Sequence, residues 1–286
     1  MTTNLADLLK HIPSRNGVIY SGMRNMDITQ GTEILLRERV AAQQYDNYLY
    51  AISKSHSISV MDHEVDQFLA KMPENAIILD VGGCWGLHWR RLADTRPDVS
   101  VLIIDFVSSN LDHAKKVLGP LVGSQIALMH ADATDLPFKI NDDFPGFNGV
   151  WTVQTFQHIP DFSKAVREAY RVLLSGGYFA NYSLHATPLN KMIYWILGKN
   201  YHIKGEVAGS YYLERANNKQ KSIVAEIFDG SYILDRYTEN LFHPDLKFSF
   251  PGHENNPFGK IDILFSDFSL IARLISRQRS FLVKKV

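Results

Sequence analysis

The sequence has one cysteine, no excess of either charge and no long apolar run. The single cysteine, Cys84, excludes an internal disulfide and a cysteine-rich metal site, which suits a reducing compartment. Thirty Lys and Arg residues balance thirty Asp and Glu residues, so the basic field typical of nucleic-acid binding is missing. The strongest apolar run, Met192–Leu197, is far shorter than the roughly 20 residues of a membrane-spanning helix. We therefore expect a cytoplasmic protein with neither nucleic-acid binding nor membrane insertion.

Several catalytic patterns are also missing. No His, Asp and Glu cluster has metal-ligand spacing, so no metal is predicted. No elbow sequence supports a Ser-His-Asp nucleophile. The first residues lack the basic and apolar regions of a secretory signal. With 45% apolar residues, the chain has the composition of an ordinary globular protein with a substantial core.

From residue 76 onward, short apolar runs alternate with helical patterns. The expected strands are Ala76–Val81, Val99–Asp105, Gln125–His130, Gly149–Val153, Tyr178–Leu184 and Ser280–Lys284. The expected helices are Asp62–Lys71, Trp85–Thr95, Ser108–Leu118 and Phe162–Leu174. Apolar strands separated by helices indicate a parallel sheet covered on both faces. Such sheets bind ligands at the carboxyl ends of their strands.

The first of these strands ends in the turn Asp80-Val81-Gly82-Gly83-Cys84-Trp85-Gly86. It does not fit the G-x-G-x-x-G fingerprint of dinucleotide sites, but it matches D-x-G-x-G-x-G at three of four positions, with Cys84 in place of the middle glycine. A carboxylate at Asp80 opposes a pyrophosphate and favours a ligand that carries an ammonium group. S-adenosylmethionine has an ammonium, a sulfonium and no phosphate.

Two further acids end the next strands. Asp105 lies 19 residues after Gly86 (105 − 86), where a carboxylate can accept hydrogen bonds from both ribose hydroxyls. Asp132 is placed to accept from an adenine amino group, with the backbone N–H of Ala133 donating to the same base. Each acid alone could serve a helix end or a turn, and their joint order favours a cofactor site.

Residues 76–184 resemble the class I S-adenosylmethionine-dependent methyltransferases, in particular the small-molecule branch that includes ubiquinone and menaquinone methyltransferases. Five segments carry the resemblance in order: Asp80–Gly86, Asp105 with Ser108–Ala114, Asp132–Phe138, His158–Asp161 and Arg171–Gly177. The resemblance implies cofactor contacts from the glycine turn, including Gly83 and Cys84, and from Asp80, Gly82, Gly86, Asp105, Phe106, Asp132 and Ala133. It also implies that Val153 and Gln154 lie beside the methionine portion, and that Tyr45 belongs to a helix closing over the cofactor.

We therefore predict one α/β domain with a Rossmann-like, doubly wound and mostly parallel seven-stranded sheet, with helices on both faces. Its expected parts are an N-terminal helical lid (1–70), a cofactor-binding core (71–185), a helical insertion that caps the acceptor (186–260) and a closing helix and strand (261–286). A homodimer is compatible with the sequence.

The predicted reaction is methyl transfer from S-adenosylmethionine to a small-molecule or glycan acceptor, most simply at a hydroxyl of a metabolite or sugar, leaving S-adenosylhomocysteine. An alcohol acceptor would require a base, for which His185 and His158 are the candidates. Two alternatives remain at this point. One is an inactive methyltransferase-fold binding protein, which Cys84 would favour, and the other is an NAD(P)-dependent reductase, which Asp80 disfavours.

Overall fold

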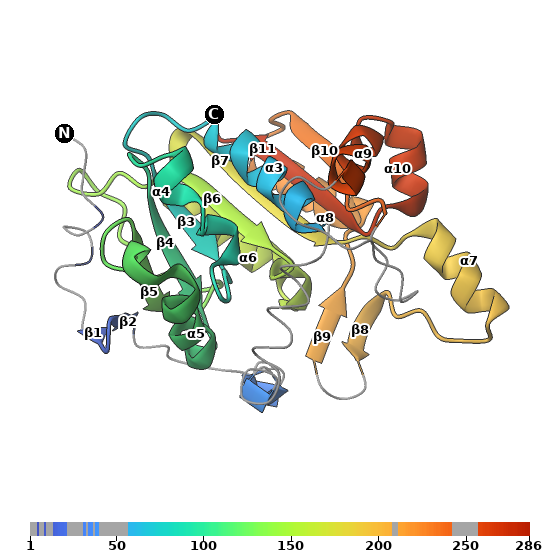
Figure 1. Ribbon diagram of the computed structural model, residues 1–286, viewed down its shortest axis with the longest axis horizontal. Helices are drawn as coiled ribbons and strands as arrows, with labels where there is room; N and C mark the ends of the chain where they lie inside the picture. Colours follow the sequence, from blue (N-terminus) through green and yellow to red (C-terminus); the bar gives the residue numbers. More distant parts are fainter. Residues whose placement is uncertain are drawn as a thin grey trace.

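The computed structural model describes residues 5, 9, 14–21, 31–32, 34–36, 38–39, 57–207, 211–241 and 257–286. Over these residues a nine-stranded mixed sheet runs through the centre of the molecule in the order β1-β2-β5-β4-β3-β6-β7-β11-β10 (Figure 1). Its strands are β1 (Ser14–Arg15), β2 (Val18–Tyr20), β3 (Ile77–Val81), β4 (Ser100–Asp105), β5 (Ile126–His130), β6 (Phe147–Val153), β7 (Leu173–Leu184), β10 (Ile233–Thr238) and β11 (Gln278–Lys284). A separate hairpin consists of β8 (Lys204–Val207) and β9 (Tyr211–Glu214).

The five central strands β5, β4, β3, β6 and β7 are parallel. β11 is antiparallel to both of its neighbours, β7 and β10. The register pairs Asp80 of β3 with Ile103 of β4, and Asp105 with His130 of β5. The carboxyl ends of β3, β4, β5 and β6 therefore meet along one edge of the sheet.

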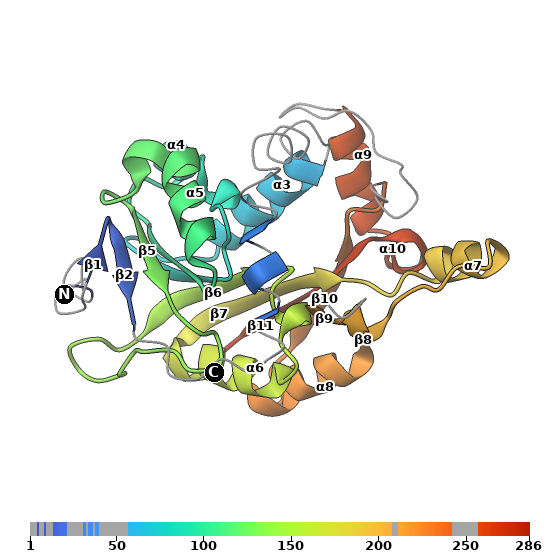
Figure 2. The same cartoon turned by 90° about the horizontal axis from the view of Figure 1, so that it is seen from below.

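Helices cover both faces of the sheet (Figure 2). One face carries α3 (Ser57–Leu69), α4 (Leu92–Thr95) and α5 (Ser108–Leu118), and the other carries α6 (Phe162–Val172) and α8 (Asn218–Ile227). Other helices in residues 57–286 are α7 (Pro188–Ile196), α9 (Pro257–Ser266), α10 (Ser269–Ile275) and the 3₁₀ turns η1 (Leu87–Trp89), η2 (Gly119–Leu121) and η3 (Phe156–His158). Two apolar cores result, one around Trp89 and Trp151 on the α3 side and one around Phe156 and Phe179 on the α6 side.

The predicted fold class is confirmed, with nine strands in place of seven. β1 and β2 lie in the segment expected to be helical and extend the sheet beyond β5. β10 lies in the segment expected to be a helical insertion. Its sequence ILDRYT contains the charged residues Asp235 and Arg236 in the middle of the strand, and only Ile233, Tyr237 and Thr238 are buried, so no apolar run indicated a strand.

Several element boundaries differ from the prediction; for example, α3 spans Ser57–Leu69 where a helix over Asp62–Lys71 was expected. The helix expected over Trp85–Thr95 is instead η1 followed by α4, because Gly86 is left-handed (φ 68°) and the chain turns to bury the Trp89 indole. β7 begins at Leu173, before the glycine pair that was expected to separate the helix from the strand. Gly176 has φ 80° inside the strand, where the pairing with β6 shifts register.

Candidate active site

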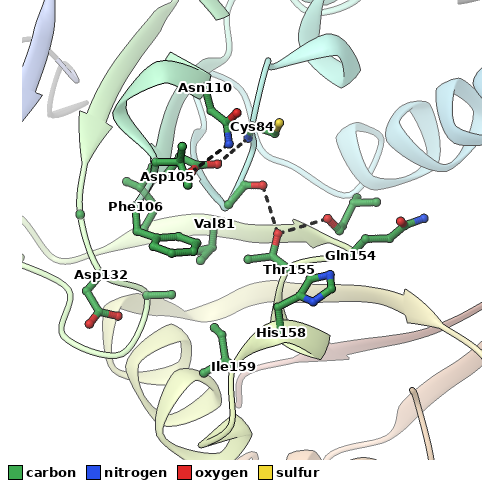
Figure 3. Close-up of a pocket in the computed structure, with 16 residues that line it drawn as sticks. Val81, Cys84, Asp105, Phe106, Asn110, Asp132, Gln154, Thr155, His158 and Ile159 are labelled. Atoms are coloured by element: carbon green, nitrogen blue, oxygen red, sulfur yellow. Dashed lines mark hydrogen bonds between the residues drawn. The ribbon is translucent and has the colours of Figure 1, made fainter. Parts of the chain in front are cut away.

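A cavity opens at the carboxyl ends of β3 to β6 (Figure 3). The structure brings together nine of the residues that the sequence singled out, and all of them line this cavity: Gly82, Cys84, Asp105, Phe106, Asp132, Ala133, Val153, Gln154 and His158. They come from four strand ends and η3, segments that lie far apart in the sequence. No lysine or arginine lies among the described residues that line the cavity.

Asp105 holds together the part of the cavity wall formed by the turn after β3 and the start of α5. Its side chain is buried, and its Oδ2 accepts a hydrogen bond of 3.0 Å from the backbone N–H of Cys84. Its Oδ1 accepts from the backbone N–H of Val107 (2.8 Å) and from the Asn110 side-chain amide (3.3 Å). A carboxylate oxygen has two acceptor sites, so Asp105 can hold the glycine turn and still accept from a ligand hydroxyl.

The turn that Asp105 holds has left-handed backbone at three residues. Gly82 has φ 70°, Cys84 φ 51° and Gly86 φ 68°. At Gly82 a Cβ atom would overlap the Thr155 side chain, whose hydroxyl donates to the Gly82 carbonyl at 3.1 Å. Glycine is therefore required at Gly82 by space as well as by backbone conformation. Cys84 adopts a conformation that costs a non-glycine residue about 1–2 kcal/mol.

Asp80 lies behind this turn, and it is not among the residues that line the cavity. Its side chain is 1% exposed, and its Oδ2 accepts from the Trp89 indole N–H at 2.7 Å. A Cβ on Gly83 would overlap the same oxygen. Burial raises the pKa of Asp80 to about 7, against the lowering effect of the Trp89 hydrogen bond. The structure thus differs from the expected ammonium contact, because Asp80 packs beneath Gly83 and supports the turn from below.

The other predicted contacts lie around the rest of the cavity. Asp132 holds its own loop, since its Oδ1 accepts from the Thr134 backbone N–H at 2.8 Å. Phe106 projects into the cavity between Asp105 and Asp132 (Figure 3). Gln154 has left-handed backbone (φ 54°), and its side chain points away from Phe106 and Asp132. The cavity therefore has an acidic, aromatic end and a second end at Val153 and Gln154.

His158 lies in the cavity wall, and both of its ring nitrogens have partners. Leu184 N–H donates to Gln157 Oε1 at 2.7 Å, which turns the Gln157 amide nitrogen toward His158 Nε2 at 3.0 Å. The Tyr212 carbonyl lies 2.8 Å from His158 Nδ1 and can only accept. His158 is therefore neutral with its proton on Nδ1, and its Nε2 lone pair is engaged by Gln157. This network ties the β8–β9 hairpin to the cavity.

His185 does not reach the cavity. It is buried between β10 and α10, where its Nε2–H donates to the Arg273 carbonyl at 3.1 Å and its ring packs edge-on against Tyr237. Burial lowers the pKa of His185 to about 4. Gly83 and Gly86 also lie outside the lining, and Tyr45 lies outside the described residues. The expectation that His185 faces the acceptor is wrong, because β11 and α10 cover the end of β7.

Sequence reasoning missed several residues of the lining, of which Asn110, Thr155 and Ile159 are examples. Asn110 lies in the first turn of α5, five residues after Asp105, where a polar side chain beside a buried acid was the available signal. Thr155 gave no signal, because its role depends on the close approach of Gly82 from another strand.

Comparison with known proteins agrees with this geometry. Residues 79–181 match the family model described as a methyltransferase domain. A malonyl-[acyl-carrier protein] O-methyltransferase of Geobacter sulfurreducens is 33% identical over 139 residues, which are 49% of this chain and 48% of that protein. The ubiquinone/menaquinone biosynthesis C-methyltransferase UbiE of Rickettsia prowazekii is 32% identical over 120 residues, 40% of this chain and 47% of that protein. The chain thus spans about half the length of the curated relatives it matches.

Solved structures show the same fold over most of the chain. A chain from the complex of the Haloferax volcanii Trm112 methyltransferase activator superposes with TM-score 0.56 at 16% identity, over 86% of this chain and 96% of that one. A Thermotoga maritima methyltransferase gives 0.55 at 13% identity, over 88% and 99%. The fold is that of the class I methyltransferases among these structures. Residues 79–181 thus match a methyltransferase domain, and part of the chain is similar to S-adenosylmethionine-dependent methyltransferases such as the ubiquinone/menaquinone enzyme.

Proposed function

We propose that this chain transfers a methyl group from S-adenosylmethionine to an oxygen of a small-molecule acceptor. The observation that carries the proposal is a cavity with two carboxylates, an aromatic side chain and neither lysine nor arginine among its described lining. A pyrophosphate cofactor would meet two negative charges there without a cationic partner. A cationic nucleoside without phosphate fits these residues.

Each residue of the cavity would bind a different part of the cofactor. Asp105 would accept from the ribose hydroxyls, with its orientation fixed by the N–H groups of Cys84 and Val107. Asp132 and the Ala133 backbone would pair with the adenine edge, and the Phe106 ring would pack against the base. Val153 and Gln154 would flank the methionine portion. When bound, the cofactor supplies a methyl group on a sulfonium, an electrophile with an excellent leaving group.

The chain's remaining task is to orient the acceptor, with its lone pair about 3–3.5 Å from the methyl carbon. The two histidines expected to act as bases are poorly placed for that role. The Nε2 lone pair of His158 is engaged by Gln157, and His185 is buried away from the cavity. Neither histidine could therefore accept the proton of an attacking alcohol. We therefore infer that the acceptor oxygen is ionised at neutral pH, as a carboxylate or an acidic phenol is.

The relatives give this proposal its context. One is named for methylation at oxygen on a malonyl acyl-carrier protein, and the other for methylation at carbon in quinone biosynthesis. Whether the transferred methyl group is found on oxygen or on carbon in the product distinguishes these two kinds of reaction.

Calorimetry with S-adenosylhomocysteine tests the site. Asp105→Ala should lower its affinity by about 100-fold, or about 2.7 kcal/mol. Asp135→Ala is the matched control, since Asp135 is an exposed acid of the same cavity-side loop that does not line the cavity. Normal binding by Asp105→Ala would contradict the site assignment. Competition by NADH would favour the reductase alternative.

Transfer of a labelled methyl group tests the reaction. Acidic phenols and carboxylates should be methylated and aliphatic alcohols should not, and His158→Gln should retain turnover to within about tenfold, because a base contributes about 10²–10⁴-fold. Tight cofactor binding without transfer to any acceptor would instead favour an inactive binding protein.

A further inference from the structure

An apolar surface lies on two adjoining helices, α7 and α10, at one end of the molecule. We define the end surface by six exposed side chains: Met192, Trp195, Ile196, Leu270, Ile271 and Leu274. Trp195 and Leu270 are each 80% exposed. Leu264 of helix α9 and Phe268, the residue just before α10, continue this surface with further exposed side chains. Exposed apolar patches of this kind mark surfaces that bind something.

The two helices are joined firmly to the sheet and to each other. The Thr187 hydroxyl, just before α7, donates to the carbonyl of Ser276 at the end of α10 at 2.6 Å. The His185 ring donates to the Arg273 carbonyl within α10. Figures 1 and 2 both place α7 and α10 next to each other, with α7 projecting beyond the body of the molecule. The end surface therefore belongs to the folded domain.

The charges carried by α7 and α10 themselves have one sign, and the exposed acid Asp267 lies just before α10. In a chain with equal numbers of acidic and basic residues, residues 185–204 contain no Asp or Glu, and neither do residues 268–286. Lys191, Lys199 and Arg273 are exposed in these segments. Helices that combine exposed Trp and Leu with Lys and Arg, without acids, have the composition of helices that lie in the interface of an anionic bilayer.

We propose that the end surface binds the protein to the surface of an anionic lipid bilayer. Trp195, Leu270 and their apolar neighbours enter the headgroup region, while Lys191, Lys199 and Arg273 face the lipid phosphates. No helix in the described part of the chain is long and apolar enough to cross a membrane, so the contact is peripheral. This proposal does not rest on the proposed methyl transfer.

The end surface lies on the same side of the sheet as the cavity, the side formed by the carboxyl ends of the parallel strands. α7 follows directly from the carboxyl end of β7, and α10 ends just before β11, whose first residue pairs with Leu184 at that same end. A bilayer on α7 and α10 would therefore lie beside the edge at which an acceptor meets the methyl group.

Tryptophan fluorescence gives a direct test. Trp85, Trp89 and Trp151 are buried, so a change on adding vesicles reports on Trp195. Vesicles of phosphatidylcholine with about one third phosphatidylglycerol should shift the emission to the blue and cosediment with the protein, at least tenfold more than pure phosphatidylcholine vesicles do. Trp195→Phe should remove the fluorescence change and retain cosedimentation.

The double variant Trp195→Glu/Leu270→Glu should lose cosedimentation by about tenfold or more. Tyr232→Glu is the matched control, because Tyr232 is 83% exposed at the opposite end of β10 and should cosediment like the wild type. Unchanged S-adenosylhomocysteine binding by the double variant would show that it is folded. Loss of cosedimentation could then be interpreted independently of the test of the proposed methyl transfer.

Three outcomes would overturn the proposal. These are no cosedimentation with either vesicle, equal cosedimentation with both, or full cosedimentation of the double variant. A wild-type dimer that the double variant converts to a monomer, in the absence of lipid, would instead assign the end surface to a second copy of the chain.

Discussion

The two halves of the sheet are built from different interactions. The half from β5 to β6 is parallel and apolar on both faces, and its polar groups are confined to the strand ends, where the cavity lies. The half from β7 to β10 is partly antiparallel and holds ion pairs in or near its interior: Arg279–Asp235 at 2.7 Å, Arg277–Glu239 at 2.6 Å and Arg236–Glu64 at 3.2 Å. The first half carries the cavity, and the second half is held by paired charges.

The largest effect expected from this difference concerns stability. Arg279 is 6% exposed, and Arg279→Met would leave Asp235 with one of its two cationic partners and cost about 3–5 kcal/mol. Urea denaturation measures the loss. The double variant Arg279→Met/Asp235→Leu should recover most of it, because the pair's charges are then removed together. No recovery would mean that packing, and not charge, fixes this half.

The two halves should also respond to pH with opposite signs. The pKa of Asp80, in the first half, is raised to about 7, so between about pH 4 and 7 the folded state holds a proton that the unfolded state lacks. Its contribution to stability falls as pH rises. The pKa of His185, in the second half, is lowered to about 4, so between about pH 4 and 6.5 the unfolded state holds the extra proton. Its contribution rises with pH.

Asp80→Asn and His185→Gln separate these two contributions. Compared with wild type, Asp80→Asn should gain up to about 4 kcal/mol of stability as pH rises across its window, and His185→Gln should lose up to about 3 kcal/mol across its own. Urea midpoints at several pH values measure both. Parallel pH profiles for the wild type and either variant would show that the group does not titrate on folding.

A third prediction concerns the ligand-binding half alone. Gly82→Ala should lower affinity for S-adenosylhomocysteine by about tenfold or more, about 1.4 kcal/mol, because the added Cβ displaces Thr155 in the cavity wall. Gly123→Ala is the control, since Gly123 also has positive φ (90°) but no neighbour within 4 Å of an added Cβ. Calorimetry should show normal binding for the control, and equal losses in both variants would assign the effect to backbone strain.

The smallest predicted effect is that of Cys84→Gly. Glycine relieves the left-handed strain at Cys84 and should stabilise the protein by about 1 kcal/mol, with less than tenfold change in cofactor affinity. Thermal denaturation and calorimetry measure the two quantities. An affinity gain above about 100-fold, or about 2.7 kcal/mol, would show that Cys84 obstructs the site and would support an inactive protein.

The first half could be predicted from the sequence because its signals are local. Strand β4 and helix α5 follow from the run that ends at Asp105 and the helix formers that begin at Ser108, and the helix bounds match the prediction. The positions of Asp105 and Asp132 in the cavity follow from the rule that parallel strands present their carboxyl ends together. Their roles as cofactor ligands stay predictions until binding is measured.

What the sequence could not predict depends on contacts between distant segments. Asp80 looked like a ligand because it ends a strand, but its orientation is decided by Trp89 and by the space beneath Gly83. His185 looked accessible because it follows β7, but α10, almost 90 residues later, covers it. The tautomer of His158 depends on Gln157 and on a hairpin carbonyl at Tyr212. None of these has a local pattern.

The pairing of β2 with β5 has a consequence for how the molecule can be divided. The segment that matches the family model, residues 79–181, begins inside β3 and ends inside β7. Excised, it would expose the edge of β5 that β2 covers and the edge of β7 that β11 covers. Two long apolar edges are templates for intermolecular pairing. The matched segment should therefore aggregate when expressed alone. The short β1–β2 hairpin protects the edge of β5, so we expect its removal to lower the solubility of the protein before it affects the cavity.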